Sequence, residues 1–196
     1  MSGLALLLGA ALFIIGLALA SVFKTDTPLG LAMIGVASSG VALLTLGSPG
    51  IVARQSSRAG WLGLIGFLLL SLSWLLLIGI GAMLELTILP WLGAHAPQVG
   101  TELLSTNAAL SVYIDVRFVL LVLGGVLLGI ATMRAGVFSR WAGLLLIVGA
   151  VLSPASFALV IFGTVANVLV SLGLGWMGYT LWITKGEAGP QAVPAS

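Results

Sequence analysis

Long runs of apolar residues, separated by short polar stretches, dominate the chain. The runs cover about residues 3–23, 29–46, 61–86, 112–133 and 141–183. A helix needs about 20 mostly apolar residues to cross roughly 30 Å of hydrocarbon. The first four runs have about this length, so the pattern predicts an all-α protein whose helices cross a membrane.

The last run is longer than one membrane crossing requires. Residues 141–183 form 43 positions without a charge, which is enough for two spans. The turn between them falls either at residues 153–156, which include Pro154, or at Gly163-Thr164, and the pattern leaves both open. With spans at about 141–158 and 163–183, the chain becomes a bundle of six transmembrane helices over residues 1–184. A flexible tail, residues 185–196, follows.

Composition supports lipid as the main solvent. The 196 residues are 60% hydrophobic and 6% charged, whereas soluble domains carry about 25% charged residues. A mean hydropathy of +1.27 agrees, and a soluble globular domain is excluded. Membrane lipid is therefore the expected partner. The net charge of +2 gives no reason to expect nucleic acid. Whether a second copy of the chain or other membrane proteins pack against it stays open.

The basic residues predict the orientation in the membrane. If the N-terminus is inside the cell, the loops and tail on that side carry Arg54, Arg58, Arg134, Arg140 and Lys185. The opposite side then carries only Lys24, next to Asp26. Short cytoplasmic loops are enriched in Lys and Arg. We therefore expect both termini in the cytoplasm and a multi-pass protein of a bacterial inner membrane.

A cleavable signal peptide is the alternative for the first run. Ala18-Leu19-Ala20 resembles a cleavage site, but no basic residue precedes the run, which is also longer than a typical signal-peptide core. We expect the first span to be retained. Cleavage would leave five spans with the same orientation.

Small residues recur at helical spacing in several runs. Ala5 and Gly9, and likewise Gly125 and Gly129, are four residues apart. In lipid, such pairs let helices approach closely. We expect them to pack within one chain rather than to form a dimer face.

Four polar residues lie within or at the edge of the predicted spans, where a charge costs at least about 2.5–3.5 kcal/mol. They are Glu85, Asp115, Arg117 and Asn167. At a rise of about 1.5 Å per residue, Arg117 lies about 25 Å from Arg134 at the inner end of its helix, and Asp115 lies about 3 Å further out. All four fall near the outer leaflet, and His95 belongs to the adjoining long connection. These five residues are the candidate site.

Two functions fit this candidate site. In the first, Glu85 pairs with Arg117 and ties two helices together, since Asp115 and Arg117 point to different faces of one helix. The protein is then a non-enzymatic structural or accessory membrane component, which the sequence favours. In the alternative, it is a small solute or ion transporter or channel with a polar site in the outer leaflet.

We expect no catalytic residue, cofactor or metal. His95 is the one histidine and there is no cysteine. Ser71 and Ser73 lie deep in the third run, far from His95, and we expect their hydroxyls to bond back to their own helix.

Overall fold

A computed structural model describes residues 1–23, 27–157 and 159–186 of the chain, and over these residues it contains helices and no strand. The α-helices are α1 (Ser2–Val22), α2 (Pro28–Gly47), α3 (Pro49–Leu76), α4 (Leu89–His95), α5 (Pro97–Thr106), α6 (Ala108–Ala135), α7 (Arg140–Leu152) and α8 (Val160–Gly186). Two π-helical turns, η1 (Leu77–Gly81) and η2 (Leu84–Ile88), continue α3, and a 3₁₀ turn, η3 (Ser153–Phe157), follows α7. The all-α prediction is confirmed.

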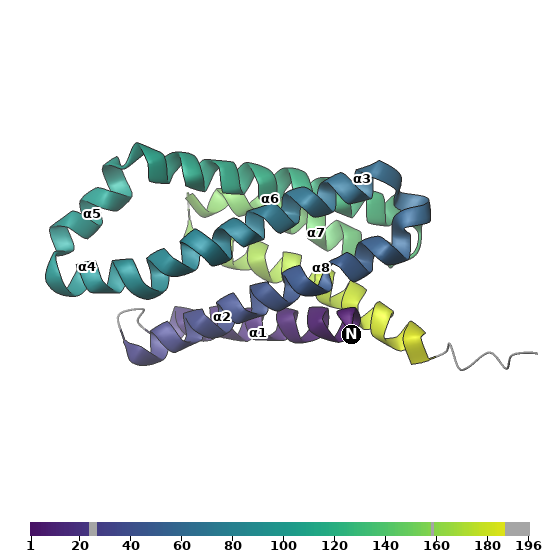
Figure 1. The fold of residues 1–196 in the computed structure, drawn as a ribbon, viewed down its shortest axis with the longest axis horizontal. Coiled ribbons are helices and arrows are strands. Elements are labelled where there is room, and N and C mark those ends of the chain that lie inside the picture. The colour runs from purple at the N-terminus through teal and green to yellow at the C-terminus, as the bar shows by residue number, and fades with distance from the viewer. Residues whose placement is uncertain (24–26, 158, 187–196) are drawn as a thin grey trace, which may run out of the picture.

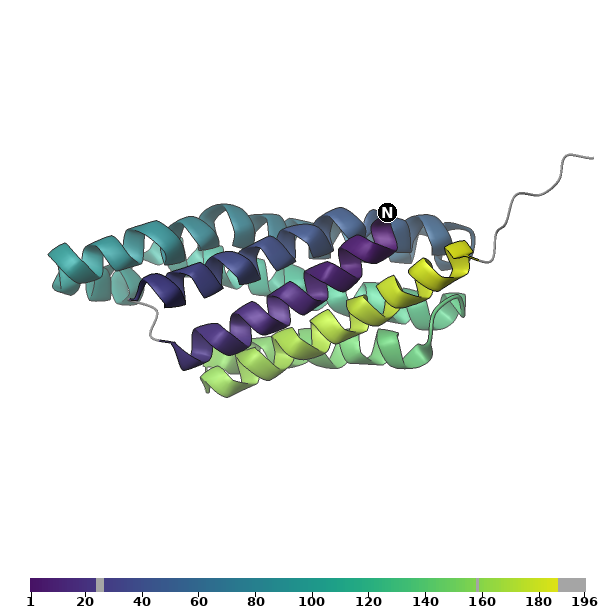
Figure 2. The same ribbon diagram turned by 90° about the horizontal axis from the view of Figure 1, so that it is seen from below.

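The long helices lie side by side in a ring. In spatial order α2 packs on α1, α1 on α8, α8 on α7, α7 on α6 and α6 on α3. The ring closes where α3 meets α2, which is the sparsest of these contacts (Figure 1). The N-terminus and the end of α8 lie at the same end of the bundle (Figure 2). One end of the ring therefore carries the N-terminus and the end of α8, and the opposite end carries neither.

Several helical segments are long and apolar enough to cross a membrane. Among the described residues these are Ser2–Val22, Pro28–His95, Ala108–Ala135 and Ile161–Thr184. The 68-residue run Pro28–His95 holds α2, α3 and α4. Within it α3 has a kink at Gly60, where φ is 57° and ψ is −153°. Glycine adopts this backbone without a Cβ penalty. Arg54 and Arg58, which were expected in a loop, therefore lie in helix α3 before the kink, and that expectation is wrong.

The long connection that holds His95, between the third and fourth apolar runs, is also largely helical. The third helix continues through the π-helical turns and α4 to His95, and α5 then runs back toward α6. This hairpin of α4 and α5 projects beyond the rest of the bundle (Figure 1). It begins just after Glu85 and so extends the end of the bundle that holds the candidate site.

The turn in the long last run begins with the 3₁₀ turn Ser153–Phe157, at the first of the two expected places. Pro154 has no N–H to donate to the carbonyl of Ala150. The backbone N–H and the hydroxyl of Ser153 both donate to that carbonyl, the hydroxyl at 2.7 Å, so the carbonyl has partners in a medium without water. As an α-helix the fifth span is shorter than expected. The 13 residues of α7 measure about 20 Å, and the 3₁₀ turn adds about 10 Å.

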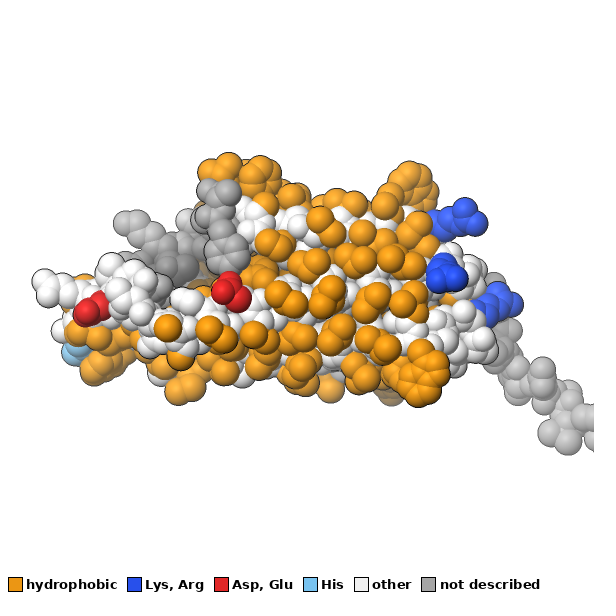
Figure 3. All heavy atoms as spheres, turned by 90° about the horizontal axis from the view of Figure 1, so that it is seen from above, with side chains coloured by type: hydrophobic (Ala, Val, Ile, Leu, Met, Phe, Trp, Pro, Cys, Tyr) orange, Lys and Arg blue, Asp and Glu red, His pale blue; other side chains and the backbone are white. Residues whose placement is uncertain are grey.

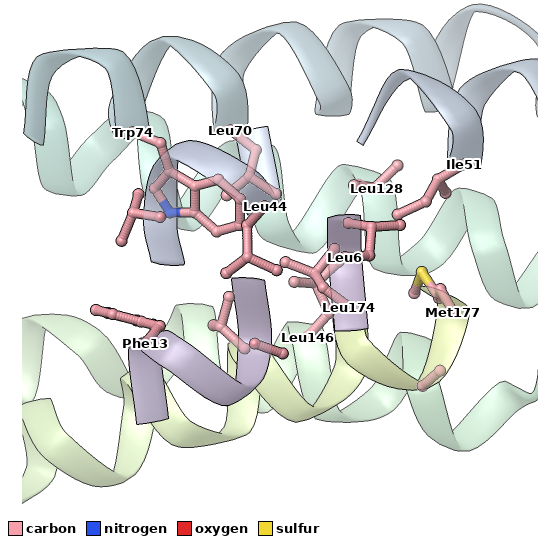
Figure 4. Close-up of a cluster of buried hydrophobic side chains, with 14 of the residues drawn as sticks. Leu6, Phe13, Leu44, Ile51, Leu70, Trp74, Leu128, Leu146, Leu174 and Met177 are labelled. Carbon is pink, nitrogen blue, oxygen red and sulfur yellow. The ribbon is translucent and has the colours of Figure 1, made fainter. Parts of the chain in front are cut away.

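Large apolar side chains fill the half of the ring nearer the N-terminus. Figure 4 shows this core, in which Leu6, Leu44 and Leu128 are fully buried. The helices approach closely at glycines. A Cβ on Gly129 would lie 2.8 Å from the carbonyl oxygen of Gly143 on α7. The glycines expected to pack within the chain do so, and the buried leucines fill the interior of this half of the ring.

Charged and aromatic side chains mark the two ends. Arg54, Arg58, Arg134 and Arg140 are exposed, and Figure 3 shows basic side chains gathered at one end, with a band of hydrophobic side chains separating them from the acidic ones. Trp61 and Trp141 are exposed near the arginines, and Trp91 is exposed at the other end. Lys185 lies in α8. Lys24, Asp26 and most of the predicted tail, residues 187–196, lie outside the described residues.

Candidate functional site

A cavity of about 260 Å³ lies inside the ring, in the half away from the exposed arginines Arg54, Arg58, Arg134 and Arg140. Helices α1, α2, α6 and α8 and the turns η1, η2 and η3 all contribute to its wall. Its apolar lining includes Phe13, Val41 and Leu121, which are buried. Its polar lining consists of Ser38, Glu85, Arg117, Ser153, Ser156 and Asn167. Three of the five predicted site residues, Glu85, Arg117 and Asn167, therefore face one space.

Glu85 belongs to the second π-helical turn. In η1 the N–H of Ala82 bonds to the carbonyl of Leu77, and in η2 the N–H of Leu89 bonds to that of Leu84, both five residues back. Each π-turn amounts to one inserted residue, which rotates the following side chains by about 100° around the helix. Such turns occur frequently at functional sites. The side chain of Glu85 is exposed to the open space of the site.

Tyr113 supports the helix where the first π-turn begins. Its hydroxyl donates a hydrogen bond of 2.7 Å to the carbonyl oxygen of Leu76, the last residue of α3. An unpaired carbonyl is costly in hydrocarbon. Tyr113 thus joins α6 to the irregular segment that carries Glu85.

Arg117 projects into the cavity from α6. Its guanidinium lies over the ring of Phe118, with 4.4 Å between the guanidinium carbon and the ring centroid. The Ser73 hydroxyl donates to the backbone carbonyl of Arg117 at 2.9 Å. Ser73 therefore links α3 to α6, and the expectation that it bonds back to its own helix is wrong.

The two charged side chains attract each other without touching. Each feels the opposite charge of the other across the site. Among the residues that the structure describes, no hydrogen bond or ion pair joins Glu85 to Arg117, and none engages the guanidinium N–H groups of Arg117. A guanidinium has five N–H donors. The direct pair expected in the structural hypothesis is therefore not formed.

Neutral polar groups complete the wall. The side-chain amide of Asn167 on α8 has no hydrogen-bond partner among the described residues, while its backbone carbonyl accepts from Ser171 at 2.7 Å. Ser38 of α2 and Ser156 of η3 add hydroxyls. Donors from three elements thus surround the same space as the guanidinium.

A wider vestibule of about 860 Å³ adjoins the cavity. It lies between α1, α2, η2, α4 and α8, and Thr164 and Pro90 are among its lining residues. Leu17, Ala20, Ile34 and Glu85 line both spaces. Glu85 therefore stands where the vestibule meets the cavity, and Arg117 lies further in.

The other two predicted site residues lie elsewhere. Asp115 is exposed on the outer face of α6, beside a shallow apolar depression with Val119 and Val122. His95 is exposed at the end of α4, where its ring stacks on Trp91 with 4.9 Å between centroids and its Nδ1 donates to the Trp91 carbonyl at 2.9 Å. Neither residue lines the cavity.

Sequence reasoning missed two sets of polar residues. Ser38, Ser153 and Ser156 line the cavity, but single serines in apolar helices do not distinguish a lined cavity from a helix-bonded hydroxyl. At the arginine end, Gln55 is fully buried and its Oε1 accepts from the Thr132 hydroxyl at 3.3 Å. The described residues contain no metal site: no group of three acidic or histidine side chains among them is placed to hold a metal ion.

No protein-family model, no curated protein and no solved structure matches this chain.

Proposed function

We propose that this chain is a multi-pass protein of a bacterial inner membrane that binds, and passes inward, a small polar solute through the cavity at its outer end. The observation that carries the proposal is a guanidinium and a carboxylate that face one cavity and form no hydrogen bond or ion pair with a described residue. Ionisable groups inside a membrane are expensive, and they mark binding sites and pathways when they face an internal space.

The six-span arrangement with cytoplasmic ends belongs to this proposal. Basic side chains gather at one end of the bundle (Figure 3), as the enrichment of basic residues in cytoplasmic loops requires. Helix α7 with the 3₁₀ turn reaches about 30 Å, the thickness of the hydrocarbon. The vestibule then opens toward the cell exterior, and the packed half of the ring faces the cytoplasm.

Side chains fill the inner half of the ring but not the outer half, which supports entry of a solute from the outside. The outer half contains the vestibule and the cavity, whereas the inner half is closed by a core that includes Leu6, Leu44 and Leu128. An open outer half and a closed inner half are what an outward-open state of a carrier requires. A static helical scaffold gives no reason to keep this space open.

Water access to Ser38 tests the proposal. The chain has no cysteine, so Ser38→Cys and its neighbour Ser39→Cys each place one thiol about 15 Å from the start of α2. Ser38 faces the cavity, while Ser39 is exposed on the outside of the helix and bonds to its own Gly35 carbonyl at 2.9 Å. We expect a charged methanethiosulfonate reagent, added outside, to modify Ser38→Cys only. Lack of reaction at position 38, or equal reaction at both positions, would overturn the proposal.

A structural role is the second candidate, because the bonds from Tyr113 to Leu76 and from Ser73 to Arg117 tie α3 to α6. In that role the attraction between Glu85 and Arg117 contributes to folding rather than to binding. An unreactive thiol at position 38 would favour this candidate.

A further inference from the structure

We infer that the cavity takes a small zwitterion with a compact apolar group, its anionic end held by Arg117 and its cationic end by Glu85. This inference rests on the proposed function and adds the class of ligand. The same chemistry occurs in a free amino-acid-like solute and in a zwitterionic lipid headgroup, and the test below separates these sources.

Charge placement gives the ligand its two ends. Arg117 presents N–H donors that no described residue accepts, and the unpartnered amide of Asn167 faces the same space. A guanidinium matches the fork of a carboxylate and forms strong charge-assisted hydrogen bonds with it. The inner part of the site is therefore built for an anionic group.

Glu85 gives the second end. Its carboxylate stands at the junction of cavity and vestibule, away from direct contact with Arg117. A purely anionic ligand would have to pass this carboxylate, and a purely cationic ligand would meet the guanidinium. A ligand with both charges satisfies each side chain, with its ammonium toward the vestibule and its carboxylate or phosphate further in.

The size and the apolar lining restrict the rest of the ligand. At about 260 Å³ the cavity lies just below the roughly 300–1,000 Å³ typical of ligand sites, so the ligand is small. Phe13, Val41, Leu77 and Leu121 form an apolar wall beside the polar groups. This wall suits a short aliphatic side group, and L-leucine combines it with the two charges.

The test uses the full-length protein in detergent and three probes. L-leucine carries both charges, 4-methylpentanoate lacks the ammonium, and 3-methylbutylamine lacks the carboxylate. We expect calorimetry to show that leucine binds more tightly than either fragment. Glu85→Gln should weaken leucine binding about 10- to 100-fold, as expected for loss of one charged contact, and should not weaken binding of 4-methylpentanoate, because it removes a charge of the same sign as that probe. Arg117→Gln should abolish binding of both.

Asp115→Asn is the matched control, because Asp115 lies on the same helix as Arg117 and outside the cavity. It should leave leucine binding unchanged. If a substituted chain fails to fold, the ranking of the three probes on the unsubstituted protein still decides the ligand class. Equal affinity for leucine and 4-methylpentanoate, or no binding of any probe, overturns the inference.

Thiol labelling at position 38 and binding in nanodiscs of two lipids separate failure of the ligand class from failure of the proposed function. If Ser38→Cys reacts from outside while no probe binds in nanodiscs of either phosphatidylglycerol or phosphatidylethanolamine, the ligand class is wrong and the proposed function stands. An unreactive Ser38→Cys means that the proposed function itself has failed. Leucine binding that appears in phosphatidylglycerol and disappears in phosphatidylethanolamine identifies the lipid headgroup as the occupant, which supports the zwitterion assignment.

Discussion

The Tyr113 hydroxyl of α6 donates a hydrogen bond of 2.7 Å to the carbonyl oxygen of Leu76, at the point where α3 gives way to a π-helical turn. The bond connects a regular helix to the irregular segment that carries Glu85. It gives that carbonyl a hydrogen-bond donor from a neighbouring helix, in a segment from which water is excluded.

Removing that hydroxyl should destabilise the bundle. We expect Tyr113→Phe to lower the free energy of unfolding in SDS titrations by about 0.6 to 1.7 kcal/mol, the average and upper values for hydrogen bonds between membrane helices. Tyr179→Phe is the control, because Tyr179 is 50% exposed and its hydroxyl has no partner among the described residues. Equal effects of the two substitutions would show that the bond to Leu76 contributes nothing.

The contact between α1 and α2 depends on glycine at position 40. A Cβ there would lie 2.8 Å from the carbonyl oxygen of Gly9, so Gly40→Ala must push the helices apart. We expect a loss of about 1–3 kcal/mol of stability, typical of overpacking.

Gly35 provides a matched control on the same helix, since nothing lies within 4 Å of a Cβ built there. Gly35→Ala should leave the stability unchanged or raise it by up to about 1 kcal/mol, because alanine favours the helix. The same SDS titration measures both variants. A Gly40→Ala protein as stable as Gly35→Ala would contradict the close packing.

Ser73 should stabilise the contact between α3 and α6. It is fully buried and its hydroxyl donates to the carbonyl of Arg117, so Ser73→Ala should cost about 1 kcal/mol of unfolding free energy. Ser71→Ala, two positions away on α3, is the comparison, because the Ser71 hydroxyl has no hydrogen bond in the described part of the chain. Indistinguishable unfolding midpoints for the two variants would exclude this role of Ser73.

A double-mutant cycle distinguishes a ligand site from a structural tie. Since Glu85 and Arg117 do not touch, we expect Glu85→Gln and Arg117→Met to show a coupling energy below about 1 kcal/mol in the empty protein, whereas a direct contact can give up to about 3 kcal/mol. The cycle is measured by unfolding each of the four proteins. A coupling near the upper value would favour the structural hypothesis.

The apolar runs predicted most of the helices, because each run must reach across the same thickness of hydrocarbon. They did not predict the helical continuation to His95. Pro90, Gly93 and His95 suggested a loop there, yet the helix continues into these residues from a long span. The π-helical turns around Glu85 were also missed, since nothing in the apolar pattern marks the inserted residue.

The candidate site was predictable in part. Charges cost so much in lipid that Glu85 and Arg117 are conspicuous in the sequence, and both face the cavity. Asp115 carries the same kind of charge at nearly the same depth but faces outward. The depth of a residue in the membrane follows from its position along the helix. Whether its side chain faces the cavity depends on which helices are its neighbours, and the apolar pattern does not predict the order of the helices in the ring.

The orientation of the bundle is the central claim, because the outward-facing site depends on it. Single cysteines replace the exposed residues Ser57, near the arginines, and Thr101 on α5, and spheroplasts that express each protein are treated with an impermeant maleimide. We predict that Thr101→Cys is labelled in intact spheroplasts and that Ser57→Cys is labelled only after the membrane is permeabilised. Labelling of Ser57→Cys and protection of Thr101→Cys in intact spheroplasts would contradict the account.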